Sequence, residues 1–257
     1  NISDFLDQAH PAAPGPRELQ RNWSQILSEA PRHEILDAIR IEPRFMDVLL
    51  TGMFKNIILL IFRVFWFLRI KGTNNLPTQG PYIICSNHAS YLDGFLIASS
   101  IGCRQAMNLF FLGYSAILEH PSINWATKVA RLISIDPNQH LTEAMQAAAF
   151  VLAQKKSVCI FPEGRRSIDE SIGEFKKGIG ILVKELGVPV VPAYIQGSHH
   201  SWPRTRRLPR VFYPLKIIFG RPIRAEELLG QTKRESALDD YEFIAKKLRE
   251  EVVKLAC

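Results

Sequence analysis

Cysteine is scarce in this sequence, and its spacing argues against two classes of protein. The four cysteines show neither the close pairing of a disulfide-stabilised secreted domain nor the spacing of a zinc site. We therefore predict no metal, and we expect reduced thiols in the core: Cys85, Cys103, Cys159 and Cys257. A charged segment followed by an apolar leader is also missing, so no signal peptide is predicted.

Two further motifs are missing. No Gly-x-Ser-x-Gly sequence marks a nucleophilic serine, and the nearest segment, 113–117, lacks the second glycine, which argues against a serine hydrolase or thioesterase. Neither paired zinc ligands nor an aromatic platform for single strands occurs, so no nucleic-acid partner is predicted. The adjacent His199 and His200 lack cysteine or acidic companions and are interpreted as loop residues.

The composition fits one sizeable α/β domain. Hydrophobic residues make up 47% of the 257 residues, which is enough for a large core. The formal net charge of +7 and the pI near 9.3 favour anionic partners such as phospholipid headgroups, coenzyme A or acyl carrier protein. Charge alone does not choose among them, because a modest basic excess also serves solubility.

Residues 87–93, Asn-His-Ala-Ser-Tyr-Leu-Asp, contain a candidate base and its orienting acid. The apolar run before them and the helical pattern after them predict a strand, a turn and a helix. Residues five apart on a helix point about 140° away from each other, so His88 and Asp93 meet only if His88 lies in the turn and Asp93 in the first helical turn. Asp93 would then hold one imidazole nitrogen while the other removes a proton from a substrate hydroxyl.

The same segment has a purely structural alternative. Ser90 and Asp93 match a capping box that opens the following helix, and a lone histidine after a strand is commonly structural. On this segment alone both hypotheses stay open.

A second polar segment, Phe161-Pro-Glu-Gly-Arg-Arg-Ser167, follows a buried-type strand. Open α/β sheets bind ligands where strands end, and two guanidiniums, a glycine and a hydroxyl suit a phosphate. The predicted anion site consists of Gly164, Arg165, Arg166 and Ser167. Glu163 is assigned an organising role, since a carboxylate repels a phosphate unless it binds the arginines or a ligand hydroxyl.

Together the two segments resemble the glycerolipid acyltransferases of the 1-acylglycerol-3-phosphate acyltransferase type. The family's H-x-x-x-x-D signature matches His88 to Asp93, its F-P-E-G-x-R-S block matches 161–167, and its V-P-x-x-P-V strand is similar to 188–194. The resemblance covers roughly residues 70–225 in the family's order. Arg165, segment 87–94 and the Trp202-Pro-Arg stretch most resemble acyltransferase domains fused to acyl-activating synthetases, so we expect an attached acyl-activating domain.

The resemblance implies an α/β fold with a central mixed or largely parallel sheet wrapped by helices. It implies that His88 deprotonates the free hydroxyl of a lysophospholipid or glycerol phosphate, that Asp93 orients His88, and that the acceptor attacks an acyl thioester. Acyl-CoA or acyl-acyl carrier protein is the expected co-substrate, without a cofactor. The acceptor phosphate would be bound by Arg165 and Arg166 together with Lys176.

One block departs from the family pattern. The family's second motif usually ends in an arginine that helps to bind the glycerol phosphate, whereas the corresponding segment 132–137 ends in proline. Arg131 is expected earlier on the strand. The identity of the acceptor is therefore left open.

The remaining pattern predicts alternating helices and strands. A helix capped by Thr142 should precede the strand before the arginine block, and another should run from 175–178 to Gly187. A late strand is expected at 215–219, and a terminal helix is expected to bury an apolar stripe of Leu238, Tyr241, Ile244, Leu248 and Val252.

Three parts are expected along the chain. Residues 1–44 are interpreted as a linker and short helices, 45–70 as an amphipathic membrane-associating helix, and 71–257 as the catalytic domain. The linker and the missing initial Met lead us to expect that the chain is a fragment of a longer protein.

The membrane question rests on an apolar run at 57–70. Its 14 residues fall short of the about 20 that span a bilayer, and Arg63 interrupts it. The charged residues fall within an arc of about 160° on a helix, which leaves a wide apolar face. A core helix that covers the sheet is an equal alternative. We expect a peripheral or monotopic protein on the cytoplasmic face of a membrane.

A competing function is a non-catalytic lipid-binding or membrane-docking module of a larger acyl-activating enzyme. Docking requires cations and apolar surface but no base. His88 and Asp93 therefore favour the enzyme.

Overall fold

The structure is a computed structural model that describes residues 22–43, 45–113, 131–135, 140–206, 208–230 and 239–257. Its centre is a seven-stranded sheet with the order β1-β7-β6-β2-β5-β3-β4. Neighbouring strands run parallel except β6 and β7, so the predicted largely parallel sheet is confirmed. The strands are β1 Arg69–Lys71, β2 Ile83–Ser86, β3 Leu109–Gly113, β4 Leu132–Ser134, β5 Ser157–Ile160, β6 Val190–Gln196 and β7 Lys216–Phe219.

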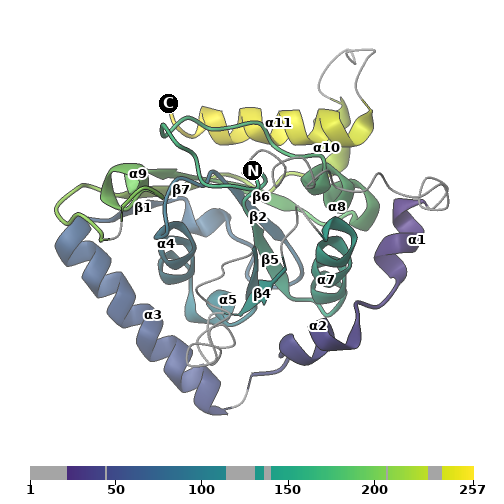
Figure 1. The fold of residues 1–257 in the computed structure, drawn as a ribbon, viewed down its shortest axis with the longest axis horizontal. Coiled ribbons are helices and arrows are strands. Elements are labelled where there is room, and N and C mark those ends of the chain that lie inside the picture. Colours follow the sequence, from purple (N-terminus) through teal and green to yellow (C-terminus); the bar gives the residue numbers. More distant parts are fainter. Residues whose placement is uncertain (1–21, 44, 114–130, 136–139, 207, 231–238) are drawn as a thin grey trace, which may run out of the picture.

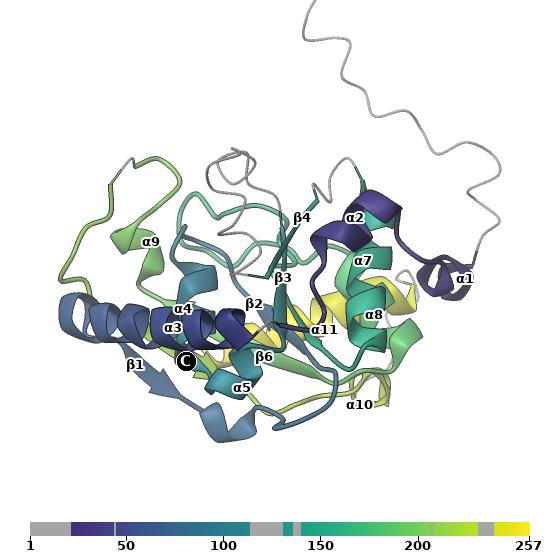
Figure 2. The ribbon, with the colours of Figure 1, turned by 90° about the horizontal axis from the view of Figure 1, so that it is seen from below.

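Helices cover both faces of the sheet (Figures 1 and 2). One face carries α1 Trp23–Ser28, α7 Leu141–Ala153, α8 Gly178–Leu186, α10 Ala225–Gly230 and α11 Asp240–Lys254. The other face carries α3 Phe45–Trp66, α4 Asp93–Ser100 and α5 Cys103–Ala106. The short elements α2 His33–Ala38, η3 Thr73–Asn75 and α9 Ser198–Ser201 lie in the connections.

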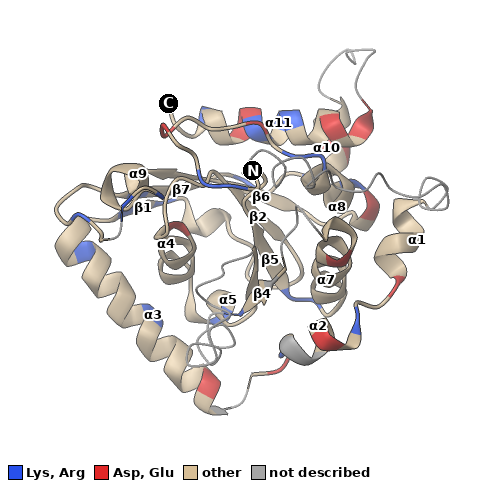
Figure 3. Ribbon diagram, viewed as in Figure 1, with Lys and Arg blue, Asp and Glu red and all other residues tan. Residues whose placement is uncertain are grey.

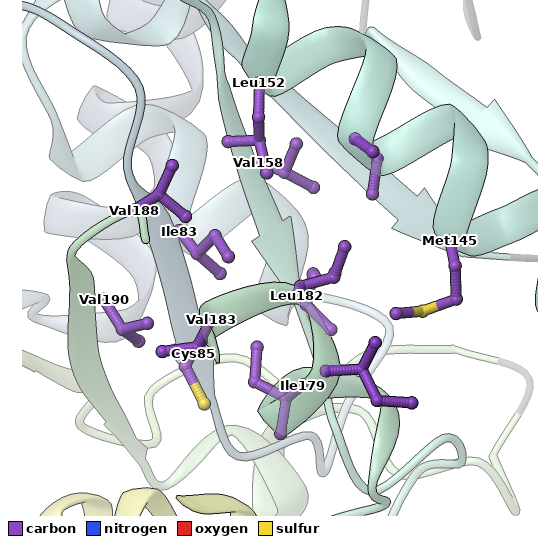
Figure 4. Packing of buried hydrophobic residues seen from close by; sticks show 14 of the residues in the cluster. Ile83, Cys85, Met145, Leu152, Val158, Ile179, Leu182, Val183, Val188 and Val190 are labelled. Atoms are coloured by element: carbon purple, nitrogen blue, oxygen red, sulfur yellow. The ribbon is translucent and has the colours of Figure 1, made fainter. Parts of the chain in front are cut away.

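The central strands are buried on both faces, which explains their uninterrupted apolar sequences. Alternate residues of β2 point to opposite sides, so Ile83 and Cys85 join one hydrophobic cluster and Ile84 joins the other. Figure 4 shows the first cluster, where strand residues meet side chains of α7 and α8 such as Met145 and Leu182.

Helices α8 and α11 approach closely at Gly180. A Cβ at this position would clash with the backbone carbonyl of Tyr241. Only glycine permits this close contact between α8 and α11.

Several local predictions are confirmed. Helix α8 ends where predicted, at Gly187, whose φ of 60° places it in the left-handed region. Ile244, Leu248 and Val252 of the terminal helix are fully buried, whereas Leu238 lies outside the described residues, as do residues 1–16.

Other local predictions are wrong. Thr142 lies inside α7, whose N-cap is His140, because the helix begins two residues earlier than a Thr142 cap requires. His199 and His200 belong to α9 instead of a loop. Cys85 and Cys159 are buried as expected, but Cys103 and Cys257 are exposed.

Helix α3 differs from its prediction in both end and length. It ends at Trp66 instead of 70, because Phe67 adopts a left-handed φ of 49° and Arg69 and Ile70 pair with β7. Residues 57–66 of the apolar run form only the last part of this helix. Met46–Trp66, a stretch of 21 residues, is long and apolar enough to cross a membrane by length and composition.

Candidate active site

His88 and Asp93 meet at the carboxyl end of β2. His88 lies in the turn after the strand, and Asp93 is the first residue of α4, as the five-residue spacing requires. His88 Nδ1 lies 2.8 Å from Asp93 Oδ2. When Nδ1 donates its proton to the carboxylate, Nε2 is left as an unprotonated nitrogen that can accept a proton.

Asp93 also organises the turn itself. Its side chain is fully buried, and Oδ2 accepts hydrogen bonds from the backbone N–H groups of Ala89 at 2.7 Å and Ser90 at 2.8 Å. The backbone N–H of Leu92 donates to Ser90 Oγ at 3.1 Å. The structural and the catalytic hypotheses therefore describe the same carboxylate, which fixes the helix start and contacts the imidazole at once.

Glu163 connects the two motifs. Its Oε1 accepts from the backbone N–H of His88 at 2.8 Å, and its Oε2 accepts from the backbone N–H of Gly173 at 3.0 Å. Burial raises the pKa of the Glu163 carboxyl, while the two backbone hydrogen bonds and His88 act to lower this pKa and Asp93 acts to raise it. The backbone N–H of Ser167 donates to the His88 carbonyl at 2.7 Å, so both backbone groups of His88 are held by segment 161–167.

Two residues of the motifs contribute contacts that the sequence did not indicate. Asn87 donates from Nδ2 to the Ile195 carbonyl at 2.9 Å and accepts at Oδ1 from the Ile195 N–H at 2.8 Å, which ties the turn to β6. The ring of Phe161 stacks on the His88 imidazole with centroids 4.2 Å apart. Both lie inside the quoted motifs, so their positions were visible but their partners were not.

Gly164 and Lys176 lie together. Gly164 has a φ of 72°, and a Cβ there would stand 2.7 Å from Lys176 Nζ, so the lysine side chain passes directly over the glycine. The backbone N–H of Lys176 donates to the Pro162 carbonyl at 2.9 Å. This arrangement brings the Lys176 ammonium to the loop that carries Arg165, whose side chain is exposed.

Arg166 is held by aromatic rings. Its Cζ lies 3.9 Å from the centre of the Tyr91 ring, and the Tyr91 ring in turn contacts the Trp202 ring with centroids 5.3 Å apart. The buried Nε of Arg166 has no hydrogen-bond partner within the described part of the chain. Ser90 Oγ donates to the Trp202 carbonyl at 2.8 Å, which joins this stack to the His88 turn.

Ser167 joins the site through its backbone. Its hydroxyl donates to Asp169 Oδ1 at 3.2 Å and accepts from the Asp169 N–H at 3.3 Å. The hydroxyl therefore stabilises the turn after the arginines.

Arg131 lies at the ends of the strands that are opposite to the candidate site. It directly precedes β4, which runs parallel to β3 and, through it, to β5 and β2, so it stands at the amino ends of strands whose carboxyl ends form the site. Its guanidinium lies 4.6 Å from the centre of the Phe110 ring, and burial lowers its pKa. Arg131 therefore does not replace the family's arginine; Asp136 and Pro137 lie outside the described residues.

Among the described residues, no group of three or more His, Cys, Asp or Glu side chains could hold a metal ion. The candidate site thus consists of a His-Asp pair, a buried organising carboxylate and cationic side chains at the ends of neighbouring strands β2 and β5.

A family model and several curated proteins are similar to this chain in sequence. The family model described as Acyltransferase matches residues 67–196. A chloroplastic 1-acyl-sn-glycerol-3-phosphate acyltransferase of Brassica napus is 31% identical over 138 residues, which cover 52% of this chain and 38% of that protein. A probable 1-acyl-sn-glycerol-3-phosphate acyltransferase of Mycoplasma pneumoniae is 28% identical over 176 residues, which cover 61% of this chain and 64% of that protein.

A solved structure shares the fold. The 1-acyl-sn-glycerophosphate acyltransferase PlsC of Thermotoga maritima superposes with a TM-score of 0.62 at 22% identity, covering 86% of this chain and 85% of that one. The chain spans well under half the length of the Brassica relative, so the match covers only part of such a protein.

Proposed function

The chain belongs to the acyltransferase family, and from that premise we propose that it transfers a fatty acyl group from an acyl thioester to the free hydroxyl of a lysophospholipid or glycerol phosphate. The observation that carries the proposal is the 2.8 Å contact between His88 Nδ1 and Asp93 Oδ2, which leaves Nε2 as the base. A lipid-docking module has no use for a histidine oriented in this way.

The reaction needs one proton carrier and no covalent enzyme intermediate. His88 Nε2 takes the proton of the acceptor hydroxyl while the oxygen attacks the thioester carbonyl carbon. The new C–O bond forms, the C–S bond breaks, and the thiolate leaves with the proton returned by the imidazolium. Asp93 stabilises that imidazolium and keeps Nδ1 as the protonated nitrogen.

The acceptor phosphate is proposed to bind Arg166, Lys176 and Arg165. Arg166 offers a planar fork that suits phosphate and is kept in place by the Tyr91 ring. Lys176 lies over Gly164 and adds a second cation at this loop. The thioester is acyl-CoA or acyl-acyl carrier protein, supplied by an acyl-activating domain attached to this one.

The protein is further proposed to sit on the cytoplasmic face of a membrane through α3 without crossing it. Phe62 and Trp66 of α3 are buried against the domain, with 3% and 6% of their surface exposed. A helix that packs along the domain in this way is held parallel to a bilayer surface more readily than across it.

The test is a product assay. Purified protein is incubated with labelled palmitoyl-CoA or palmitoyl-acyl carrier protein and a panel of lysophospholipids and glycerol 3-phosphate, and the acylated lipid is identified by mass spectrometry. We expect a diacyl or monoacyl product with the wild type and about 10²- to 10⁴-fold slower formation of it with His88→Ala. Vesicle binding without any acylated product would favour the docking module instead.

A further inference from the structure

The loop 208–213, between α9 and β7, exposes a group of apolar side chains. Leu208 is 76% exposed and Phe212 is 62% exposed, and Val211 and Tyr213 are exposed as well. A contiguous apolar patch on a soluble surface usually marks a contact with a partner or a membrane.

This loop is fixed to the carboxyl end of α3. The backbone N–H of Phe212 donates to the Phe65 carbonyl at 2.6 Å, and Trp66 Nε1 donates to the Arg210 carbonyl at 2.7 Å. The Phe212 ring lies 6.3 Å from the Phe65 ring and 6.4 Å from the Phe67 ring. Figures 1 and 2 show the segment after α9 beside this end of the helix.

Helix α3 continues the same surface. At about 100° per residue, its buried residues Phe62 and Trp66 fall on one side of the helix. Its exposed apolar side chains fall within an arc of about 160° on the other side. The exposed set is Met46, Leu49, Met53, Phe54, Ile57, Leu60, Ile61, Val64 and Phe65. The left-handed backbone at Phe67 ends the helix and leaves that ring 52% exposed, next to Phe212.

The charges on α3 and on the segment after α9 are mostly positive, and the acidic exceptions near this surface are Asp47 in the first turn of α3 and Glu170, which pairs with His200 beside the Tyr213 ring. Residues 202–216 contain four arginines and one lysine without any aspartate or glutamate, and residues 48–75 also lack acidic side chains. Arg204, Arg206 and Arg210 are exposed beside the apolar tip. Figure 3 shows Lys and Arg positions on α3 and on the segment after α9. Apolar side chains flanked by cations complement an anionic bilayer surface.

We propose that loop 208–213 is a second lipid-inserting element, which enters the same anionic bilayer surface as α3 with Leu208 and Phe212 foremost. One anchor holds a protein to a surface but leaves it free to rotate about that contact. Two anchors joined at Phe65 and Phe212 fix the orientation of the domain.

That orientation matters for the proposed function, on which this step rests. The segment that carries the loop starts near Trp202, whose carbonyl accepts from Ser90 Oγ and whose ring contacts Tyr91. Insertion of loop 208–213 therefore brings the His88 turn and Arg166 close to the bilayer surface. A lysophospholipid would present its headgroup there while its acyl chain stays in the lipid.

The test compares Leu208→Ser and the double variant Leu208→Ser/Phe212→Ser with the wild type by co-sedimentation with vesicles of phosphatidylcholine and phosphatidylglycerol. Loss of inserted apolar side chains should weaken binding by about threefold to tenfold for the single variant and by about tenfold to hundredfold for the double variant. Leu141→Ser, an exposed leucine on α7 at the other face of the sheet, is the matched control and should bind like the wild type.

A second readout separates this proposal from the proposed function. With a short-chain lysophospholipid below its micelle concentration and a soluble acyl-CoA, turnover of the loop variants should stay within twofold of the wild type. Failure of the wild type to acylate anything would remove the proposed function but leave the vesicle result to decide the lipid contact.

Equal vesicle binding by the wild type and Leu208→Ser/Phe212→Ser would overturn the second anchor. So would a wild-type dimer, detected by light scattering, that the double variant converts to monomer without loss of vesicle binding, because a second copy would then cover the patch. Leu208 is 76% exposed, so the single variant keeps the test valid if removal of the Phe212 ring destabilises the fold.

Discussion

Glu163 Oε1 accepts a hydrogen bond from the backbone N–H of His88 at 2.8 Å, across 75 residues of sequence. The other carboxylate oxygen, Oε2, accepts a hydrogen bond from the backbone N–H of Gly173 at 3.0 Å. A carboxylate supplies two acceptors and no donor, so it alone satisfies both N–H groups. Glu163 thus fixes the backbone of His88, the proposed base, which accounts for a carboxylate beside the proposed phosphate site.

Glu163→Gln should destabilise the protein and reduce turnover. The amide replaces one acceptor with a donor that faces a backbone N–H, and an unsatisfied buried group costs about 1–3 kcal/mol in the free energy of unfolding. Urea unfolding of the two proteins measures this loss. Glu226→Gln is the control, because Glu226 is exposed on α10 and its replacement should change little.

The pH dependence of stability should change in the same variant. Burial raises the pKa of Glu163, so between the unfolded-state pKa and the higher folded-state pKa the folded protein binds the extra proton. This contribution to stability is present below the unfolded-state pKa and is lost as the pH rises through the folded-state pKa. Glu163→Gln should lack this decline, and melting temperatures measured across mildly acidic pH would show it; parallel curves would contradict the shift.

The local geometry of the site could be predicted from sequence, but its long-range contacts could not. The spacing of His88 and Asp93 was enough to predict their contact, because the two residues lie in one turn and at the start of the helix that follows it. The contact of Glu163 with His88 depends on the pairing of β2 with β5, and the contact of Tyr91 with Trp202 depends on a segment beyond β6. A local sequence pattern predicts neither the order of the strands in the sheet nor the course of a loop.

The predicted ends of helices were wrong where tertiary contacts determine the end. The apolar pattern of α3 continues past Trp66, yet Arg69 and Ile70 pair with the edge of β7 and end the helix. The two faces of α3 illustrate the same limit. The wide apolar face predicted from the sequence is the exposed one, whereas the buried Phe62 and Trp66 lie on the side that carries the charged residues, so the sequence did not indicate which face packs on the domain.

His88→Ala should reduce turnover by about 10²- to 10⁴-fold with little change in melting temperature. Asp93 keeps its hydrogen bonds from Ala89 and Ser90, so the start of α4 is retained. Steady-state kinetics and thermal unfolding on the same preparation check both statements. Turnover within a few-fold of the wild type would exclude His88 as the base.

Tyr91→Leu should weaken acceptor use, because it removes the ring 3.9 Å from the Arg166 guanidinium. A cation over an aromatic ring contributes about 0.5–2 kcal/mol, so the KM for the acceptor should rise about two- to thirtyfold while the KM for the thioester is unchanged. Tyr91→Phe keeps the ring and should behave like the wild type. A fall in kcat alone, with the acceptor KM unchanged, would contradict the positioning role.

Arg166→Gln should weaken acceptor use by about ten- to a hundredfold, since a charge-assisted contact contributes about 1.5–3 kcal/mol. Arg166→Lys restores the charge without the bidentate fork and should recover only part of the loss. Arg165→Gln should cost less, because its side chain is exposed. Kinetics with donor and acceptor varied separately decide the assignment, and a defect confined to the donor would assign the loop to the phosphates of coenzyme A or its carrier protein.

Arg249 on α11 should influence turnover without touching substrate. Its Nε donates to the Gly173 carbonyl at 2.9 Å and its Nη2 to the Ile172 carbonyl at 2.8 Å. Gly173 in turn donates to Glu163, which accepts from the His88 backbone N–H, so a path of hydrogen bonds links the terminal helix to His88. Arg249→Met should therefore lower kcat several-fold while both KM values stay near those of the wild type.

The conservative variant separates positioning from general loss of stability. Arg249→Lys can restore one of the two carbonyl contacts and should recover part of kcat, even if both variants melt at similar temperatures. Lys254→Met, on the same helix with a side chain 65% exposed, is the control and should leave kcat unchanged. If kcat in Arg249→Met followed the folded fraction alone and Arg249→Lys gave no recovery, the path from α11 to His88 would have only a structural role.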